Sequence, residues 1–253
     1  MKKEDLFAEH MRDLAERAYA HGVPLYTDFL SMYEIHILRS LPAASYGVQL
    51  QFSGGFESAE RQMAVFVPDA LSFVPQIDYP ISCIRIGFRS GKFSDQLTHR
   101  DVLGALLSTG IERDKIGDIL LGRQDGCFFC CRNMAEMLCR EVVSMKHTQV
   151  DLQLWEDPQP DLFAPREKMI RTTVASLRPD ALISAAFGIA RSKSTTLITE
   201  GRVFANGKLI TSNGYKVREN DLFSVRGLGR CRYQESTGTS QKGKLHVQLI
   251  RYE

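Results

Sequence analysis

The chain has 253 residues, of which 43% are apolar and 25% are charged, so it can fold as one large or two to three small domains. Its longest apolar runs fall far short of the ~20 residues that span a bilayer, which excludes an integral membrane protein. The charged amino terminus lacks the apolar region of a signal peptide, and six cysteines do not form a disulfide framework in a chain this long. We therefore expect reduced thiols and a cytoplasmic protein.

The charge is distributed unevenly along the chain. Residues 166–253 contain 16 Lys and Arg against 7 Asp and Glu, a net charge of +9, whereas residues 1–165 carry a net charge of −7. A short basic segment is typical of a surface that binds a polyanion such as nucleic acid, although a solvated charged surface gives the same count.

The first third of the chain combines helices and short strands. Apolar spacing predicts a helix over Lys3–Tyr19, and Asp28 is placed to cap a second helix that reaches Leu38. The pair Gly54-Gly55 is interpreted as a turn, with a phosphate cradle as the alternative. Two strands flank this pair, at Tyr46–Phe52 and Met63–Val67.

The middle third alternates strands and helices in the order β-α-β-β-α-β. Thr98 and Asp101 start the first helix as a capping box, and Asn133 is expected to cap the second, over Met134–Val143. This order is typical of the ferredoxin-like unit that RNA-recognition modules also use. The expected strands are Ile81–Phe88, Ile116–Leu121, Cys127–Cys130 and Thr148–Leu154.

A proline-rich stretch, Trp155–Pro165, coincides with the charge change and predicts a semi-rigid linker. Beyond it we expect a helix over Arg166–Ser176, a second helix starting at Pro179, and a third from near Ser192 to Gly201. The dipeptide Asn206-Gly207 predicts a hairpin. Two further strands are expected at Leu222–Arg226 and His246–Tyr252.

The basic segment resembles the S4 RNA-binding domain over Arg178–Arg226. The resemblance is carried by Arg178-Pro179-Asp180, Ala190-Arg191-Ser192-Lys193 and Asn206-Gly207-Lys208, with Pro179 and Ala190 departing from the common Leu and Ser. Cations at the start of a helix add to the attraction of its free N–H groups for phosphate. Asp180 is expected to cap a helix or pair with an arginine.

The wider pattern resembles the YlmH family of bacterial RNA-binding proteins. Arg226-Gly227-Leu228-Gly229-Arg230, the stretch Gly54–Arg61 and the stretches Leu97–Leu106 and Gly110–Ile119 carry this resemblance. The loop Thr237–Lys244 has one cation fewer than expected. The resemblance implies an N-terminal domain, a central domain like an RNA-recognition module, and a C-terminal S4 domain. It also implies a link to the large ribosomal subunit, to the rescue of stalled translation and to cell-division genes.

We therefore predict an α+β protein with a small N-terminal α/β domain (1–76), a central ferredoxin-like domain (77–157) and an αL-type S4 domain with a C-terminal extension (166–253). The predicted function is non-enzymatic docking on structured rRNA of the large subunit, with tRNA as a second candidate, in the quality control of stalled translation. No cofactor, metal or membrane insertion is expected. The alternatives are an RNA-modifying enzyme and a septum-associated adaptor with cell-division partners.

The candidate RNA contacts are cations, small polar residues and glycines of the basic segment: Arg178, Arg191, Ser192, Lys193, Thr196, Asn206, Lys208, Arg226, Gly227, Gly229, Arg230, Lys242 and Lys244. Secondary candidates surround one central helix, and they could equally pair with nearby aspartates: His99, Arg100, Arg113 and Lys115.

Three other motifs do not fit the chemistry they suggest. His99-Arg100-Asp101 resembles a kinase catalytic loop, but position 106 is Leu instead of Asn. Cys127-x₂-Cys130 lacks a second ligand pair for zinc, so buried thiols are expected. Gly126-Cys127-Phe128-Phe129 fits the base-stacking consensus of RNA-recognition modules poorly, so the central sheet is not expected to stack bases in the usual way.

Overall fold

The computed structural model describes residues 3–71, 77–88, 97–122, 125–163, 166–241 and 243–252. The chain divides into an N-terminal unit, Met1–Ala164, and a C-terminal unit, Pro165–Glu253. Both units combine helices with antiparallel sheets, so the predicted α+β class is confirmed. Predicted domains 1–76 and 77–157 lie together in the N-terminal unit.

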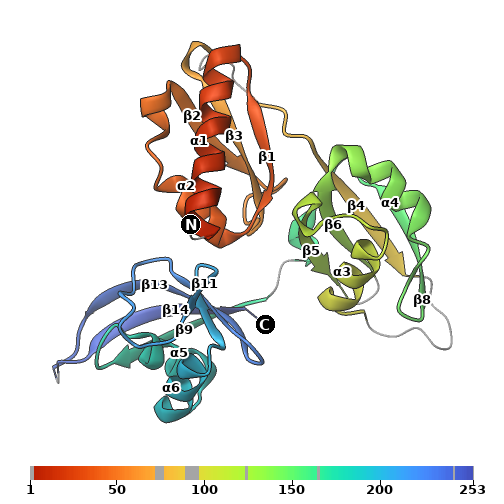
Figure 1. Cartoon of the computed structure of the whole chain (residues 1–253). Helices are drawn as coiled ribbons and strands as arrows, with labels where there is room; N and C mark the ends of the chain where they lie inside the picture. The colour runs from red at the N-terminus through yellow and green to blue at the C-terminus, as the bar shows by residue number, and fades with distance from the viewer. Residues whose placement is uncertain are drawn as a thin grey trace. The chain divides into compact units, whose positions relative to one another are not determined.

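The N-terminal unit begins with a three-stranded antiparallel sheet of order β1-β3-β2. Helices α1 and α2 pack on one face of it around Met11, Leu38 and Phe66 (Figure 1). The elements are α1 (Lys3–His21), β1 (Leu25–Leu30), α2 (Met32–Arg39), η1 (Ala43–Tyr46), β2 (Val48–Ser53), β3 (Gln62–Pro68) and η2 (Asp69–Leu71).

The cap of α2 differs from the prediction. Ser31, not Asp28, caps this helix, through a reciprocal capping box with Glu34. Asp28 lies within β1, a strand that the sequence analysis missed, and its carboxylate pairs with Lys115. The predicted cap was wrong because Asp28 does not bond the start of α2 but forms an ion pair with Lys115, which is distant in sequence.

The central part of the same unit is the ferredoxin-like sheet that the sequence predicts. Its strands run antiparallel in the order β5-β6-β4-β8-β7, with α3 and α4 packed around Ile84, Phe128 and Leu138. The elements are β4 (Ile81–Phe88), α3 (His99–Leu107), η3 (Arg113–Lys115), β5 (Ile116–Leu121), β6 (Asp125–Cys131), η4 (Arg132–Met134), α4 (Ala135–Glu141), β7 (Ser144–Met145), β8 (Thr148–Leu154) and η5 (Pro160–Phe163).

Two predictions for this part need correction. Asn133 lies inside η4, and α4 starts after Met134 with no side-chain cap, so Asn133 is not the cap. The predicted linker is also packed against the domain, not extended away from it, over residues 155–163. Its Trp155 ring meets the Phe163 ring edge-to-face at 6.2 Å, and both rings pack against the central sheet.

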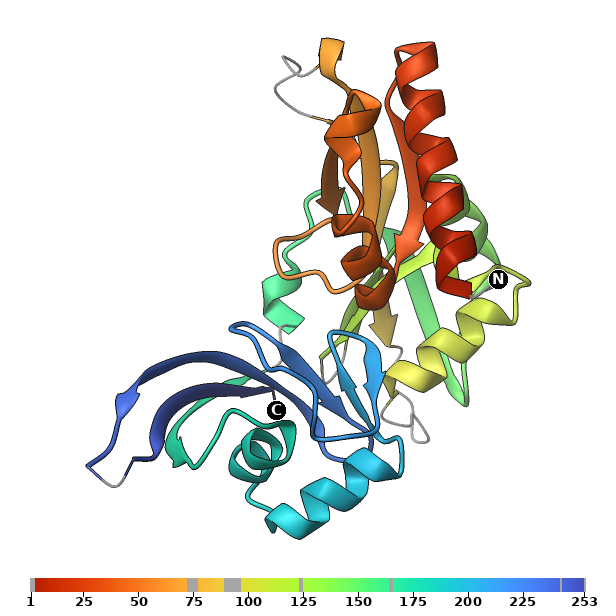
Figure 2. The same cartoon turned by 60° about the vertical axis from the view of Figure 1, so that its left-hand side comes forward.

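The C-terminal unit has a six-stranded antiparallel sheet of order β11-β10-β12-β13-β14-β9. Helices α5 and α6 cover one face of it around Leu182, Ile198 and Phe223, as both views show (Figures 1 and 2). The elements are β9 (Glu167–Val174), α5 (Pro179–Phe187), α6 (Arg191–Thr199), β10 (Val203–Ala205), β11 (Lys208–Ile210), β12 (Leu222–Val225), β13 (Gly229–Thr239) and β14 (Leu245–Tyr252).

The predicted helix over Arg166–Ser176 is wrong, because this segment forms strand β9. Eight residues of β9 pair with β14, and the run Thr172-Thr173-Val174 is β-branched, which favours a strand. Strand β13 was also missed, and it includes Thr237–Thr239 of the predicted glycine loop. The Asn206-Gly207 hairpin is confirmed, with φ of 48° and 77° as a type I′ turn requires.

Candidate nucleic-acid interface

The start of the S4 helix pair is organised by one buried carboxylate. Asp180 is 3% exposed and accepts hydrogen bonds from the Nε atoms of Arg178, at 3.2 Å, and Arg191, at 2.5 Å. Both arginine side chains remain about half exposed, at 49% and 47%. The expected pairing of Asp180 with an arginine is therefore confirmed. Asp180 therefore holds both guanidinium groups by their Nε atoms, while part of each guanidinium stays open to solvent.

The first turn of α6 extends this cationic surface. The N-cap of α6 is Ala190, whose side chain has no hydrogen-bond acceptor. The Ser that is common at this position could accept a hydrogen bond from a first-turn N–H group, and Ala cannot. Ser192, Lys193 and Thr196 are not buried, and Thr196 donates its hydroxyl to the Ser192 carbonyl. We define Arg178, Arg191, Ser192 and Lys193 as the clamp surface.

The hairpin residue Asn206 is held by the protein itself. Its amide donates to Asp221 Oδ1 at 2.7 Å and accepts from the Leu222 N–H at 2.9 Å, and Asp221 is 4% exposed. This bonding explains how a residue with positive φ is stabilised in the turn. Lys208, next to the turn, is exposed.

The Arg226–Arg230 segment comprises the turn between β12 and β13 (residues 226–228) and the first two residues of β13. Gly227 and Gly229 have φ of 85° and 109°, which favours glycine at both positions. The Arg226 guanidinium lies 4.9 Å from the centre of the Phe204 ring, and the Arg226 carbonyl accepts a hydrogen bond from Arg202. Arg230 lies 5.7 Å from the centre of the Tyr252 ring.

Lys244 lies apart from this turn. It follows the β13–β14 hairpin tip, where Thr239 pairs with Leu245, whereas Arg230 pairs with Tyr252 at the other end. With ~3.3 Å per residue, β13 separates the two ends by roughly 30 Å. Lys242 lies outside the described residues. The predicted contacts therefore do not form one compact patch.

The secondary candidates of the central domain have different surroundings. His99 and Arg100 are exposed at the start of α3. Lys115 pairs with Asp28 at 2.5 Å, and Arg113 donates to the main-chain carbonyls of Ile116 and Gly117. Burial lowers the pKa of Arg113 to about 10. Arg113 and Lys115 are thus engaged inside the N-terminal unit, but with main-chain carbonyls and Asp28 instead of the expected nearby aspartates Asp101, Asp114 and Asp118.

Arg61 and Asp118, both in stretches that carry the family resemblance, complete this junction. The Arg61 guanidinium donates to the carbonyls of Ile116, at 2.9 Å, and Phe29, at 2.8 Å. Asp118 accepts from the main-chain N–H groups of Glu60 and Arg61. Burial lowers the pKa of Arg61. Stretches 54–61 and 110–119 therefore join the two sheets of the N-terminal unit.

The helix-free face of the central sheet is covered by protein. Phe129 is 1% exposed and stacks on Phe56 with ring centres 4.9 Å apart, and Phe29 and Met63 of the first sheet join the same core. RNA-recognition modules stack bases on this face, so base stacking is blocked here. The Gly54-Gly55 turn packs onto it, since a Cβ on Gly55 would lie 2.5 Å from Phe129.

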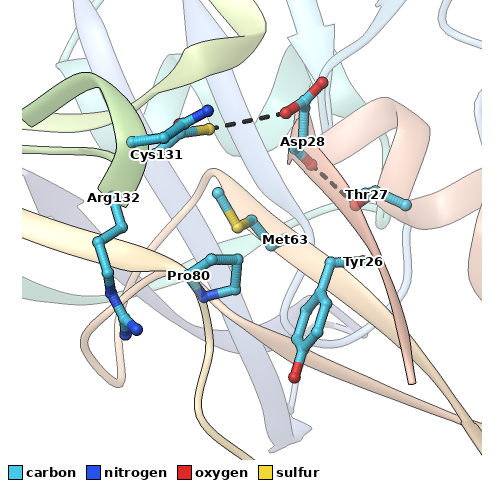
Figure 3. Close-up of a pocket in the computed structure, with 8 residues that line it drawn as sticks. Tyr26, Thr27, Asp28, Met63, Pro80, Cys131 and Arg132 are labelled. Atoms are coloured by element: carbon cyan, nitrogen blue, oxygen red, sulfur yellow. Dashed lines mark hydrogen bonds between the residues drawn. The ribbon is translucent and has the colours of Figure 1, made fainter. Parts of the chain in front are cut away.

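A hollow of about 510 Å³ lies beside this junction, lined by residues that include Tyr26, Asp28, Met63 and Cys131 (Figure 3). The Cys131 thiol donates to Asp28 Oδ1 at 3.6 Å. Burial raises the pKa of this thiol to about 12, so it stays protonated at neutral pH and is a poor nucleophile. In the described ranges, no group of three or more His, Cys, Asp or Glu side chains could hold a metal ion.

Comparisons with known proteins match both halves of this description. The family model described as "Putative RNA-binding domain in YlmH" matches residues 75–157, and the S4 domain model matches residues 180–223. The chain is also 30% identical over 225 residues to the "Ribosome-associated protein quality control protein P2" of Bacillus subtilis (strain 168), covering 89% of this chain and 86% of that protein.

The chain belongs to the YlmH family. A solved structure, "Cell division protein ylmH from Streptococcus pneumoniae", shares the fold, with a TM-score of 0.52 and 24% identity over 61% of this chain and 93% of that chain. Both matched models are RNA-binding domains, which agrees with the RNA-binding class that the sequence predicts for this YlmH-family chain. None of its described helices is both long and apolar enough to cross a bilayer.

Sequence reasoning missed several residues at this surface of the YlmH-family chain. Phe204 and Tyr252 lie beneath arginines, and Arg232 donates from Nε to the Tyr252 hydroxyl at 3.0 Å. Periodicity gives no signal for them, because an aromatic residue in a strand is usually buried core. The spacing of Arg226, Arg230 and Arg232 could have indicated these residues, but only in combination with the strand register.

Proposed function

We propose that the protein is a non-enzymatic RNA-binding factor that associates with the ribosome in the cytoplasm. In this proposal it docks on structured rRNA of the large subunit, with tRNA as a second contact, and acts in the quality control of stalled translation. The name of the Bacillus subtilis relative supports the ribosome and quality-control parts. The S4 match and the +9 charge of residues 166–253 support RNA as the ligand.

The observation that carries the proposal is the clamp surface. Asp180 holds two arginines at the start of α5 and α6, and Lys193 adds a third cation within one helical turn. Pre-positioned guanidinium groups bind phosphate oxygens at a lower entropic cost than free arginines. A surface built from fixed cations and helix N–H groups recognises the backbone of a folded RNA rather than its sequence.

Docking therefore depends on charge and shape instead of base stacking on the central sheet. That sheet has its helix-free face buried against the first sheet, so we assign the N-terminal unit no role in base stacking. The exposed His99 and Arg100 remain candidates for phosphate contacts.

The test is the salt dependence of RNA binding. We expect Arg191→Ala with Lys193→Ala to weaken binding and to reduce the slope of log affinity against log salt by ~0.7–0.9 per lost phosphate contact, or roughly 1.4 to 1.8 for the pair. Fluorescence anisotropy with large-subunit rRNA fragments at several salt concentrations measures both quantities. Arg12→Ala with Arg17→Ala removes the same charge from α1 and should leave the slope unchanged. An unchanged slope in the Arg191/Lys193 variant contradicts the assignment.

A further inference from the structure

The second face of the C-terminal sheet carries a row of aromatic and arginine side chains. The strand register aligns Phe204 with Ser224, Ser224 with Arg230, and Arg230 with Tyr252. Cross-strand partners lie on the same face of a sheet, so all four share one face. Their neighbours in sequence, Val203, Val225, Cys231 and Arg251, point to the other face, where the first three pack beneath α5 and α6.

Each of the two rings has at least one guanidinium group next to it. Arg226 lies 4.9 Å from the centre of Phe204, and Tyr252 has Arg230 at 5.7 Å and Arg232 at 6.0 Å. The Tyr252 hydroxyl accepts from Arg232, which fixes the ring and the arginine together. Strand spacing of ~4.8 Å across three steps places the rings about 14 Å apart. We define Phe204, Arg226, Arg230, Arg232 and Tyr252 as the stacking row.

The stacking row is accessible within its unit and strongly basic. Phe204 and Tyr252 are partly exposed, and no helix of described residues 166–241 and 243–252 covers this face (Figure 2). The row contains three arginines. The strand register also places one acidic residue, Glu167, beside Tyr252. Such a face complements an anionic ligand that also has flat aromatic parts.

We propose that the stacking row binds unpaired nucleotides of the RNA. This inference rests on the proposed function and adds a second contact of different chemistry to the clamp surface. Unpaired bases stack on aromatic rings and on arginine planes, and both are present here in fixed pairs. The arginines supply the counter-charge for the phosphates between stacked bases. The turn between β12 and β13 contains Gly227 and is followed by Gly229, and the absence of side chains at these two positions allows close approach of the RNA backbone.

The test compares two RNAs with the full chain: a blunt RNA hairpin and the same hairpin with a short unpaired tail. We expect the tail to tighten binding of the wild-type protein. Phe204→Leu and Tyr252→Leu keep apolar bulk but remove the ring, and each should lose about tenfold in affinity for the tailed RNA only, equivalent to ~1.4 kcal/mol. Tyr252→Phe, which keeps the ring, should retain the gain. Tyr19→Leu on α1, an exposed ring elsewhere, is the matched control.

The outcomes separate this inference from the function on which it rests. If both leucine variants keep the full gain from the tail, or lose affinity equally for both RNAs, the stacking row is not a nucleotide site, and the clamp surface stands. If wild-type protein binds neither RNA, the proposed function fails together with the inference. Photo-crosslinking of the tailed RNA should recover the peptide that contains Tyr252, and recovery only of peptides from the N-terminal unit contradicts the proposal.

Discussion

Asp180→Asn separates the position of the clamp arginines from their charge. The substitution removes the carboxylate that both arginines contact, but keeps Arg178, Arg191 and the shape of the side chain. It also makes the protein more positive by one charge. If RNA binding depended on charge alone, affinity would rise. If it depends on pre-positioned guanidinium groups, affinity should fall.

The expected magnitude follows from the two hydrogen bonds. A hydrogen bond to a charged group contributes ~1.5–3 kcal/mol, and the half-exposed arginines reduce this, so the free energy of unfolding should fall by ~1–3 kcal/mol. Freeing two side chains costs RNA binding ~0.5–1.5 kcal/mol each, together roughly 5- to 150-fold in affinity.

The assay is anisotropy with an rRNA fragment at fixed salt, together with urea denaturation to show that the variant is folded. Glu219→Gln makes the same change of charge at an exposed position and should bind as tightly as wild type or slightly more tightly. A folded Asp180→Asn variant with wild-type or higher affinity refutes the reasoning.

The remaining predictions concern the N-terminal unit and use urea denaturation. Gly55→Ala should lower the free energy of unfolding by ~1–3 kcal/mol, because φ is +91° and the new Cβ would meet Phe129, whereas Gly104→Ala in α3 has open space and should be neutral or stabilising; equal effects contradict this. Arg61→Met should cost ~1–3 kcal/mol, because the Phe29 and Ile116 carbonyls lose the Arg61 donor although Ile116 keeps Arg113, and a cost near zero would show that the junction is dispensable. Burial raises the pKa of Tyr79 to about 12 from an ordinary value of 10, so the unfolded chain loses that proton first and stability should fall between pH 10 and 12, less steeply in Tyr79→Phe.

Local patterns predicted the elements that local physics determines. The ferredoxin-like order, the capping box at Thr98 and the Asn206-Gly207 hairpin were all confirmed. The prediction of a helix over Arg166–Ser176 was wrong because the apolar pattern of this segment is ambiguous between helix and strand, and pairing with β14 makes it a strand. Asp28 failed as a cap because Ser31 and Glu34 form the capping box of α2, while Asp28 pairs with Lys115. Asn133 failed because it lies in the short helix η4, and α4 then starts without a side-chain cap.

The candidate site shows the same division. Charge and family resemblance located Arg178, Arg191 and Lys193, but only the fold shows that Asp180 joins two of the three. Arg113 and Lys115 are cations and so qualified as RNA contacts by residue type. Only the fold shows that they lie at the junction between the two sheets of the N-terminal unit. The stacking row depends on the register between strands that are distant in sequence, and no local pattern contains that register.

Sucrose-gradient sedimentation of the tagged protein in a cell lysate tests the central claim most directly. At low salt we predict co-migration with the large ribosomal subunit, which high salt or Arg191→Ala with Lys193→Ala abolishes, because the contact is mainly with phosphates. Wild-type protein that stays at the top of the gradient at low salt contradicts ribosome association. A double variant that co-migrates as well as wild type contradicts the assignment of docking to the clamp surface.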